Sequence, residues 1–157
     1  GALPIMGYNY GARDRKRFLT TLRCAVLVAV GIMAAGNLLF FLLPDKLLLL
    51  FDASSGMLAL GVPALRIISC SYLFAAVGLI LSTLFQAAGR GGYSLTVFLL
   101  RQLLVVVPLA FLLSQWLGVN GIWISFPIAE AAGALAAGLF FLRFRRRDLI
   151  FRTVAGG

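Results

Sequence analysis

The chain has 157 residues, of which 62% are hydrophobic and 12% are charged, and its 14 Lys and Arg against 5 Asp and Glu give a net charge of +9. A water-soluble domain this apolar lacks the polar surface that it needs, so the composition predicts an integral membrane protein. The sequence has no His, and its two Cys, Cys24 and Cys70, fall inside or at the edge of apolar runs, so neither a metal site nor a disulfide framework is indicated.

Four long apolar runs are each long enough to cross a bilayer. About 20 helical residues span the hydrocarbon layer, and we place the spans at about residues 18–43, 63–88, 94–116 and 119–142. The runs are apolar nearly all round, as helices that face lipid are. We therefore predict an all-α integral membrane fold with four transmembrane helices, in contact with the lipid of the inner (cytoplasmic) cell membrane.

Basic residues flank these spans unevenly. The charges are counted against the apolar runs of the spans, which are Cys24–Leu43, Ile67–Gly89, Leu103–Trp116 and Val119–Leu142. All of the 14 Lys and Arg except Lys46 and Arg66 stand before the first run, between the second and third, or after the fourth. The middle group consists of Arg90 and Arg101. By the positive-inside rule, both ends of the chain are predicted to be cytoplasmic, including a basic tail over 143–157. Nucleic acid is not an expected partner, because it requires a basic face on a soluble fold.

Turn signals between the spans agree with this count. Pro44-Asp45 closes the first span, and the short segment Leu47–Phe51 is predicted to lie at the outer interface or to pack into the extracellular mouth. Asp52-Ala-Ser-Ser-Gly predicts a turn with a capping hydroxyl before a helix that runs through Pro63. Pro108 lies inside the third span, where we expect a kink.

Small and weakly polar side chains share one face of the second span. They recur three or four residues apart, at Ser71, Ala75, Gly78, Ser82 and Gln86. Such a face allows close packing against another helix, or it forms the wall of a water-filled cavity. The sequence leaves both interpretations open.

Glu130 is the one acidic residue inside a predicted span. An ionised residue at the bilayer centre costs about 2.5–3.5 kcal/mol on insertion scales, so such groups face a cavity or a partner and often mark an ion path. Glu130 is therefore our candidate for ion coupling in transport. The alternative is a structural carboxyl, either protonated or hydrogen-bonded to Asn37, Arg101 or Gln102.

No catalytic constellation competes with transport. A Ser-His-Asp triad is impossible without His, and no pair of carboxylates has catalytic spacing within one element. Gly7-Tyr-Asn-Tyr-Gly lacks the Gly-Lys-Ser/Thr ending of a phosphate loop. We expect a protein that is not an enzyme and that has no catalytic residues, cofactor or bound metal.

Several motifs resemble one transporter family. They are, in chain order, Pro4-Ile-Met-Gly-Tyr-Asn-Tyr-Gly-Ala-Arg, Phe85-Gln-Ala-Ala-Gly-Arg, Arg101-Gln with Pro108 downstream, Gly118-Val-Asn-Gly-Ile-Trp, and Phe126-Pro-Ile-Ala-Glu130. Each is similar to a motif of the multidrug and toxic compound extrusion (MATE) transporters, and together they cover essentially the whole chain.

The resemblance implies a twelve-helix plan in two six-helix lobes, of which residues 1–157 resemble the last four helices, a partial C-terminal lobe. The chain begins at Gly1 without a Met and is expected to be a fragment whose partner is the missing N-terminal lobe. The family implies export of small organic cations by alternating access, in antiport with Na⁺ or H⁺.

The resemblance also bears on individual residues. Gln86, Arg101 and Gln102 match family positions in the cytoplasmic half, and with Asn37 they are the candidates for the cavity or for gating. Some family members hold their coupling cation with an acid in the helix that matches Ile67–Gly89, but this run has no Asp or Glu.

Two alternatives from other classes stay open. One is a lipid-linked saccharide flippase of related fold, which is expected to line its cavity with more cationic residues than these spans offer. The other is a self-standing four-helix membrane scaffold protein.

Overall fold

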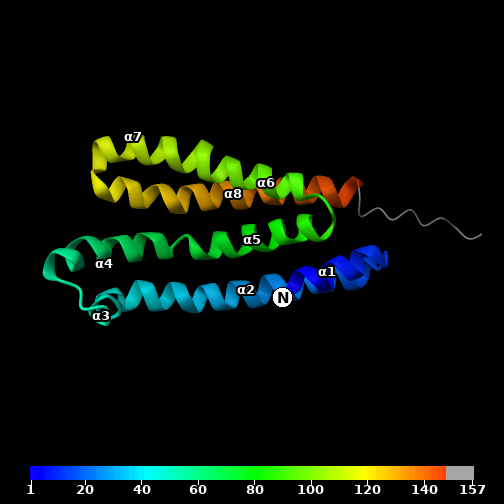
Figure 1. Ribbon diagram of the computed structural model, residues 1–157, viewed down its shortest axis with the longest axis horizontal. Coiled ribbons are helices and arrows are strands. Elements are labelled where there is room, and N and C mark those ends of the chain that lie inside the picture. The colour runs from blue at the N-terminus through cyan, green and yellow to red at the C-terminus, as the bar shows by residue number, and fades with distance from the viewer. Residues whose placement is uncertain (148–157) are drawn as a thin grey trace, which may run out of the picture.

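The computed structural model describes residues 1–147, and every element in this range is a helix (Figure 1). The elements are α1 (Ala2–Gly11), α2 (Arg15–Leu42), α3 (Pro44–Leu49), α4 (Ser55–Ser69), α5 (Tyr72–Ala87), α6 (Gly91–Leu99), the π-helix η1 (Leu100–Val106), α7 (Val107–Leu117) and α8 (Val119–Arg147). The long rods lie side by side, with α5 between α2 and α8 and with α7 packed along α8. The all-α prediction is confirmed.

Membrane crossings follow the predicted plan, with one difference. Three continuous helical runs are long and apolar enough to cross a membrane, namely Arg15–Leu42, Gly91–Leu117 and Val119–Arg146. The fourth crossing is a pair, Ser55–Ser69 and Tyr72–Ala87, bent by 51° at a short break. The second span is therefore not the single helix that we predicted over residues 63–88.

Side-chain hydrogen bonds explain this break. The hydroxyl of Ser69 and the thiol of Cys70 both donate to the carbonyl of Arg66, at 2.9 and 3.4 Å, and the hydroxyl of Ser71 donates to the carbonyl of Ile68 at 2.6 Å. Three successive side chains thus compete for the carbonyls that a helix would use. The backbone turns at this point, and the apolar character of the span continues through the turn.

The turn chemistry predicted between the first two spans is present. Helix α2 ends at Leu42, just before Pro44, which begins the short α3. The Ser54 hydroxyl accepts a hydrogen bond from the Met57 amide at 3.4 Å and caps α4. Arg66 Nε donates to the carbonyl of Phe41 at 3.3 Å, which satisfies one of the free carbonyls in the last turn of α2.

The third span contains the π-helix η1. Pro108 has no backbone N–H for the carbonyl of Leu104, so the regular i→i−4 pattern cannot continue through it. The chain is π-helical over residues 100–106 and returns to α-helix at Val107. Arg101 belongs to this π-helix, inside the apolar run Gly91–Leu117. Arg101 thus lies inside the third span, as the predicted bounds 94–116 imply, and not in the cytoplasmic gap where the charge count placed it.

The hydrophobic core lies at the basic end of the bundle, where α1 meets the ends of α2, α5 and α8 (Figure 1). The buried members of this core are Met6, Phe18, Leu22, Leu81, Leu84, Phe85, Ala88, Val97, Ala137 and Phe144. The ring of Tyr10 contacts those of Phe18 and Phe144, with centroids 5.6 and 6.0 Å apart. Helix α1, which the sequence does not predict, is thus part of the core.

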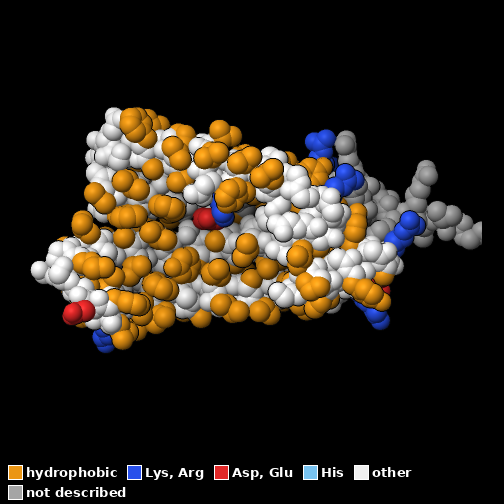
Figure 2. Space-filling model, in the orientation of Figure 1, with side chains coloured by type: hydrophobic (Ala, Val, Ile, Leu, Met, Phe, Trp, Pro, Cys, Tyr) orange, Lys and Arg blue, Asp and Glu red, His pale blue; other side chains and the backbone are white. Residues whose placement is uncertain are grey.

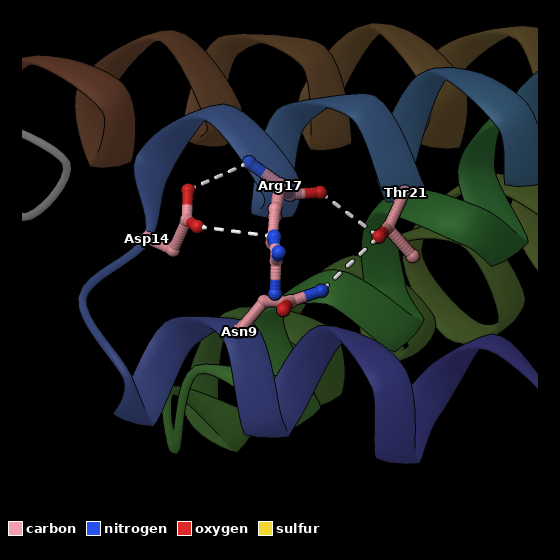
Figure 3. Close-up of polar contacts among 4 residues, drawn as sticks. All are labelled: Asn9, Asp14, Arg17 and Thr21. Carbon is pink, nitrogen blue, oxygen red and sulfur yellow. Dashed lines mark hydrogen bonds and ion pairs between the residues drawn. The ribbon is translucent and has the colours of Figure 1, made fainter.

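Polar contacts fix α1 against α2 (Figure 3). Asp14 is the N-cap of α2 and accepts a hydrogen bond from the Arg17 amide at 2.9 Å. The buried Asn9 donates from Nδ2 to the Thr21 hydroxyl at 3.2 Å, and this hydroxyl donates to the Arg17 carbonyl at 2.9 Å. The first two turns of α2 and the last turns of α1 therefore form one unit.

Helix α8 continues past the predicted end of the fourth span. The helix continues beyond residue 142 as far as Arg147, and the Phe144 ring within this arginine-rich stretch is fully buried. Figure 2 shows basic side chains gathered at this end of the molecule, over a surface that is otherwise largely apolar. The remainder of the predicted basic tail, residues 148–157, lies outside the described residues.

Candidate functional site

A polar cavity of about 160 Å³ lies between α5, α6, η1 and α8. Its lining residues are Gly78, Leu79, Ser82, Gln86, Ser94, Val97, Phe98, Arg101, Glu130, Gly133 and Ala134. Gly78, Ser82 and Gln86 come from the polar face predicted on the second span, and in this part of the span the face is a cavity wall.

The cavity holds an ion pair between two membrane-spanning segments. Arg101 Nη1 donates to Glu130 Oε2 at 2.9 Å, and the two side chains are 26% and 19% exposed. Figure 2 shows an acidic and a basic side chain meeting near the middle of an otherwise apolar face. Of the three partners predicted for Glu130, the structure selects Arg101. The pair places no net charge in the apolar interior, which reduces the cost of burying either ion.

Local geometry brings Arg101 to the carboxylate. Gly133 lies one turn after Glu130 on α8, so the two share a face. A Cβ added at Gly133 would lie 3.1 Å from Arg101 Cδ and 3.4 Å from its Cβ and Cγ. The missing side chain of Gly133 therefore makes room for the arginine stem, which lies against α8 and reaches back to Glu130.

The hydrogen bonding of the guanidinium is incomplete. A guanidinium has five N–H donors, and here Nη1 meets the carboxylate while Nε is buried without a hydrogen-bond partner among the described residues. The Phe98 ring lies beside the group, with its centroid 5.9 Å from Arg101 Cζ. Arg101 is therefore held by one carboxylate oxygen and one aromatic ring.

The other candidates divide between the cavity and its surroundings. Gln86 lines the cavity and donates from Nε2 to the Ser94 hydroxyl at 3.0 Å. Gln102 is exposed and Asn37 is half-buried on α2, and neither lines the cavity. The structure thus brings Glu130, Arg101 and Gln86 together and leaves Gln102 and Asn37 apart from them. Their roles in gating or transport stay predictions.

The cavity residues that the sequence did not reveal include Ser94, Phe98 and Gly133. Ser94, Phe98 and Arg101 follow one another at intervals of four and three, which places them on one helix face. That spacing is the signal that was available for Ser94 and Phe98. Gly133 has no such signal, because its role depends on which helix crosses α8 at this point.

A larger apolar groove of about 740 Å³ lies along α5 and α8. Its lining residues are Phe74, Val77, Ala131, Ala134, Leu135, Gly138, Leu139, Phe141 and Leu142. Ala134 lines both this groove and the polar cavity. A charged site and a large apolar surface therefore meet at the packed contact between α5 and α8.

Comparison with known proteins gives consistent results. The profile of the MatE family matches residues 1–112. The multidrug export protein MepA of Staphylococcus saprophyticus is 26% identical over 147 residues, which are 94% of this chain and 32% of that protein. The chain thus spans about a third of the length of the curated relatives that it matches.

Two solved structures share the fold. An inward-facing multidrug resistance MATE family transporter of the MOP superfamily superposes with a TM-score of 0.87 at 24% identity, over 97% of this chain and 36% of the other. An outward-facing transporter of the same description superposes with a TM-score of 0.85 at 26% identity, over 94% of this chain and 34% of the other. With the profile covering most of the residues and the helices arranged as in these transporters, the chain belongs to the MatE family.

Proposed function

We propose that this chain is part of a secondary active transporter that exports cationic organic compounds from the cell, in antiport with Na⁺ or H⁺. The observation that carries the proposal is the Arg101–Glu130 pair in a polar cavity between membrane-spanning segments of a MatE-family fold. The relatives named as multidrug export proteins and multidrug resistance transporters support it.

The chemistry of the cavity suits an ion-coupled exporter. A carboxylate away from bulk water attracts cations strongly, because the surroundings screen its charge weakly. Glu130 is the group that a proton, a Na⁺ ion or an organic cation would compete for. An amphipathic cation also needs apolar surface, and the α5–α8 groove supplies it beside the cavity.

The chain's share of its relatives supports a two-lobe protein. Relatives are about three times as long, so further helices are expected to pack against the lipid-exposed face and to complete the transport path. The same fold matches an inward-facing and an outward-facing structure almost equally well. This supports a segment that moves as one body during alternating access.

The distribution of charge supports an orientation. The basic residues of α2 and α8 and the core around α1 lie at one end, and α3, which carries Lys46, lies at the other (Figure 1). By the positive-inside rule the first end faces the cytoplasm, with the α1–α2 turn and the end of α8 on that side of the inner membrane (Figure 1). Gly1 itself lies beside Val28 and Ile32, in the middle of α2, so the prediction that both ends of the chain are cytoplasmic does not extend to Gly1.

The test is efflux of ethidium, a fluorescent organic cation, from drug-sensitive bacterial cells. One strain makes the protein with its native upstream coding sequence, a second makes the 157-residue chain alone, and a third carries the empty vector. We expect energy-dependent efflux above the vector background from the extended protein alone. Absence of ethidium efflux, with the protein present in the membrane, contradicts the proposed function. Efflux by the short chain contradicts the two-lobe part of the proposal.

A further inference from the structure

The Arg101 guanidinium occupies a site that has the features of a receptor for a free cation. Its partners are a carboxylate oxygen at 2.9 Å and an aromatic ring 5.9 Å away. A carboxylate with an aromatic face is the combination that proteins use to hold planar or quaternary organic cations. In this structure the bound cation belongs to the protein itself.

The pair lacks the features of a permanent structural ion pair. The free-energy cost of burying two charges is offset by their attraction only when the geometry is very good and the remaining donors are hydrogen-bonded. Arg101 contacts Glu130 through Nη1, and its Nε is buried without a partner among residues 1–147. The interaction is therefore weaker than a two-pronged arginine–carboxylate pair, and a competing cation can replace it at moderate cost.

The surroundings offer the displaced guanidinium another position. Ser82, Gln86 and Ser94 line the same cavity and carry oxygen atoms that accept hydrogen bonds. Arg101 also belongs to a π-helix, a helical form that is rare, less favourable than the α-helix and frequent at functional sites. The backbone that carries Arg101 is thus a part of the span where the helix geometry is able to change.

We propose that Arg101 is a tethered occupant of a site for planar organic cations, formed by the Glu130 carboxylate and the Phe98 ring, and that a substrate cation enters this site by displacing Arg101. The class of ligand rests on the proposed function, whereas the site itself rests on the contacts of Arg101. The guanidinium holds the carboxylate when no substrate is bound, and returns to it after release.

The experiment measures equilibrium binding of ethidium to the purified protein, made with its native upstream sequence, in detergent. Wild type is compared with Arg101→Gln and with Arg23→Gln, a control that removes one exposed positive charge outside the cavity. We expect Arg101→Gln to lower the Kd about tenfold, the equivalent of one charge-assisted hydrogen bond that ethidium no longer has to displace. Arg23→Gln is expected to leave the Kd unchanged.

A second comparison tests whether the tighter ethidium binding of Arg101→Gln depends on the Glu130 carboxylate. The double variant Arg101→Gln/Glu130→Gln is expected to bind ethidium no more tightly than wild type, because the acceptor is gone. Tighter binding that survives in the double variant overturns the proposal, and so does an Arg101→Gln variant that binds ethidium as weakly as wild type or more weakly.

Folding is monitored by gel filtration. If Arg101→Gln aggregates, Arg101→Lys takes its place, since an ammonium group lacks the planar face and the fork of donors that suit this site. We expect an intermediate decrease in Kd, and an unchanged or increased Kd overturns the proposal. Ethidium efflux by the wild-type protein in the same cells separates the two hypotheses. If the cells export ethidium but Arg101→Gln does not lower the Kd, the displacement of Arg101 is contradicted and the transport function is not. If Arg101→Gln lowers the Kd but the cells do not export ethidium, the transport function is contradicted and the cation site is not.

Discussion

Two opposite charges meet inside the membrane-spanning part of the described chain, the Glu130 carboxylate and the Arg101 guanidinium. Each ion makes the other tolerable in an apolar surrounding. Gly133 contributes to this arrangement, since an added Cβ would lie 3.1–3.4 Å from the arginine stem and would require it to shift. The site therefore depends on one residue of η1 and two of α8, and its paired charges, Arg101 and Glu130, are 29 positions apart in the sequence.

Replacing Glu130 by Gln tests the coupling role of the carboxylate. The amide keeps the size of the side chain and loses the charge that binds cations, so we expect the initial rate of ethidium efflux to fall about tenfold or more. The amount of protein in the membrane, measured by immunoblot, is expected to stay the same. Asp45→Asn, which neutralises an exposed acid outside the cavity, is the matched control. Normal efflux by Glu130→Gln would leave Glu130 with a packing role.

Gly121 is a second position where the absence of a side chain is essential. A Cβ there would collide with the carbonyl group of Leu113 and would lie 2.8 Å from the Ser114 amide nitrogen. These are backbone atoms of α7 and do not move aside. We expect Gly121→Ala to destabilise the protein by about 1–3 kcal/mol, seen as a lower Tm in detergent. Gly138→Ala, with nothing within 4 Å of the added Cβ, is expected to be neutral or slightly stabilising. Equal Tm values for the two variants would contradict this account.

At the scale of elements, the structure is held together mainly at the basic end. The Phe144 ring lies against Tyr10 and Phe85, with centroids 6.0 and 6.2 Å apart, and so joins α8 to α1 and α5. The Tyr93 ring stacks on Phe140 at 5.2 Å and adds α6 to the same group. With Phe18 of α2, whose ring lies 5.6 Å from that of Tyr10, five helices meet in one aromatic cluster.

Removing the central ring of this cluster is expected to loosen all of these contacts. We expect Phe144→Ala to cost about 3–5 kcal/mol, as for other fully buried Phe side chains, and to lower the Tm in detergent. Leu142→Ala, on the same helix turn but 52% exposed, serves as the control and is expected to change the Tm little. A similar Tm for both variants would show that the cluster does not stabilise the fold.

The elements also show what sequence patterns are able to predict. Hydropathy placed the four crossings because lipid demands long apolar runs, and the Ser54 cap was recognisable from local chemistry. Helix α1 was not recognisable from its sequence, because Pro4, Gly7 and Gly11 lower helix propensity and the helix is stabilised by packing. Phe144 is inconspicuous between arginines, and its burial depends on α1, which is more than 130 residues earlier.

The candidate site was also predicted only in part, because local patterns are visible in a sequence and tertiary contacts are not. A carboxylate within an apolar run is conspicuous in any sequence, so Glu130 and a short set of possible partners were identified. Selecting Arg101 from that set, or recognising Gly133, requires knowing which face of α8 meets the third span. That information is tertiary, and the π-helix around Arg101 changes the helical register on which such an estimate depends.

The whole molecule is polarised, with its basic end and its aromatic core together and its short helix α3 at the opposite end (Figure 1). In the orientation proposed above, Tyr8 on α1 is cytoplasmic and Ser55 at the start of α4 faces the other side. Both are exposed. Labelling at these positions therefore reports the direction in which the bundle is inserted.

We expect a membrane-impermeant maleimide, applied to intact cells, to label Ser55→Cys and to leave Tyr8→Cys unlabelled. The two changes are made in a protein whose Cys24 and Cys70 have been replaced by Ala, because both native thiols are exposed. Permeabilised cells, in which both positions are expected to react, provide the control. Labelling of Tyr8→Cys alone in intact cells would reverse the proposed orientation.

The α7–α8 turn has a practical consequence for spectroscopy. Both tryptophans of the 157 residues stand beside it, Trp116 at 90% exposure near the end of α7, and Trp123 early in α8 with its indole N–H buried and without a partner in the described part of the chain. The emission of these residues depends on the polarity around the indole ring. Intrinsic fluorescence of this segment is therefore a label-free reporter of the end remote from the basic core, which in the proposed orientation is the outer end of the bundle.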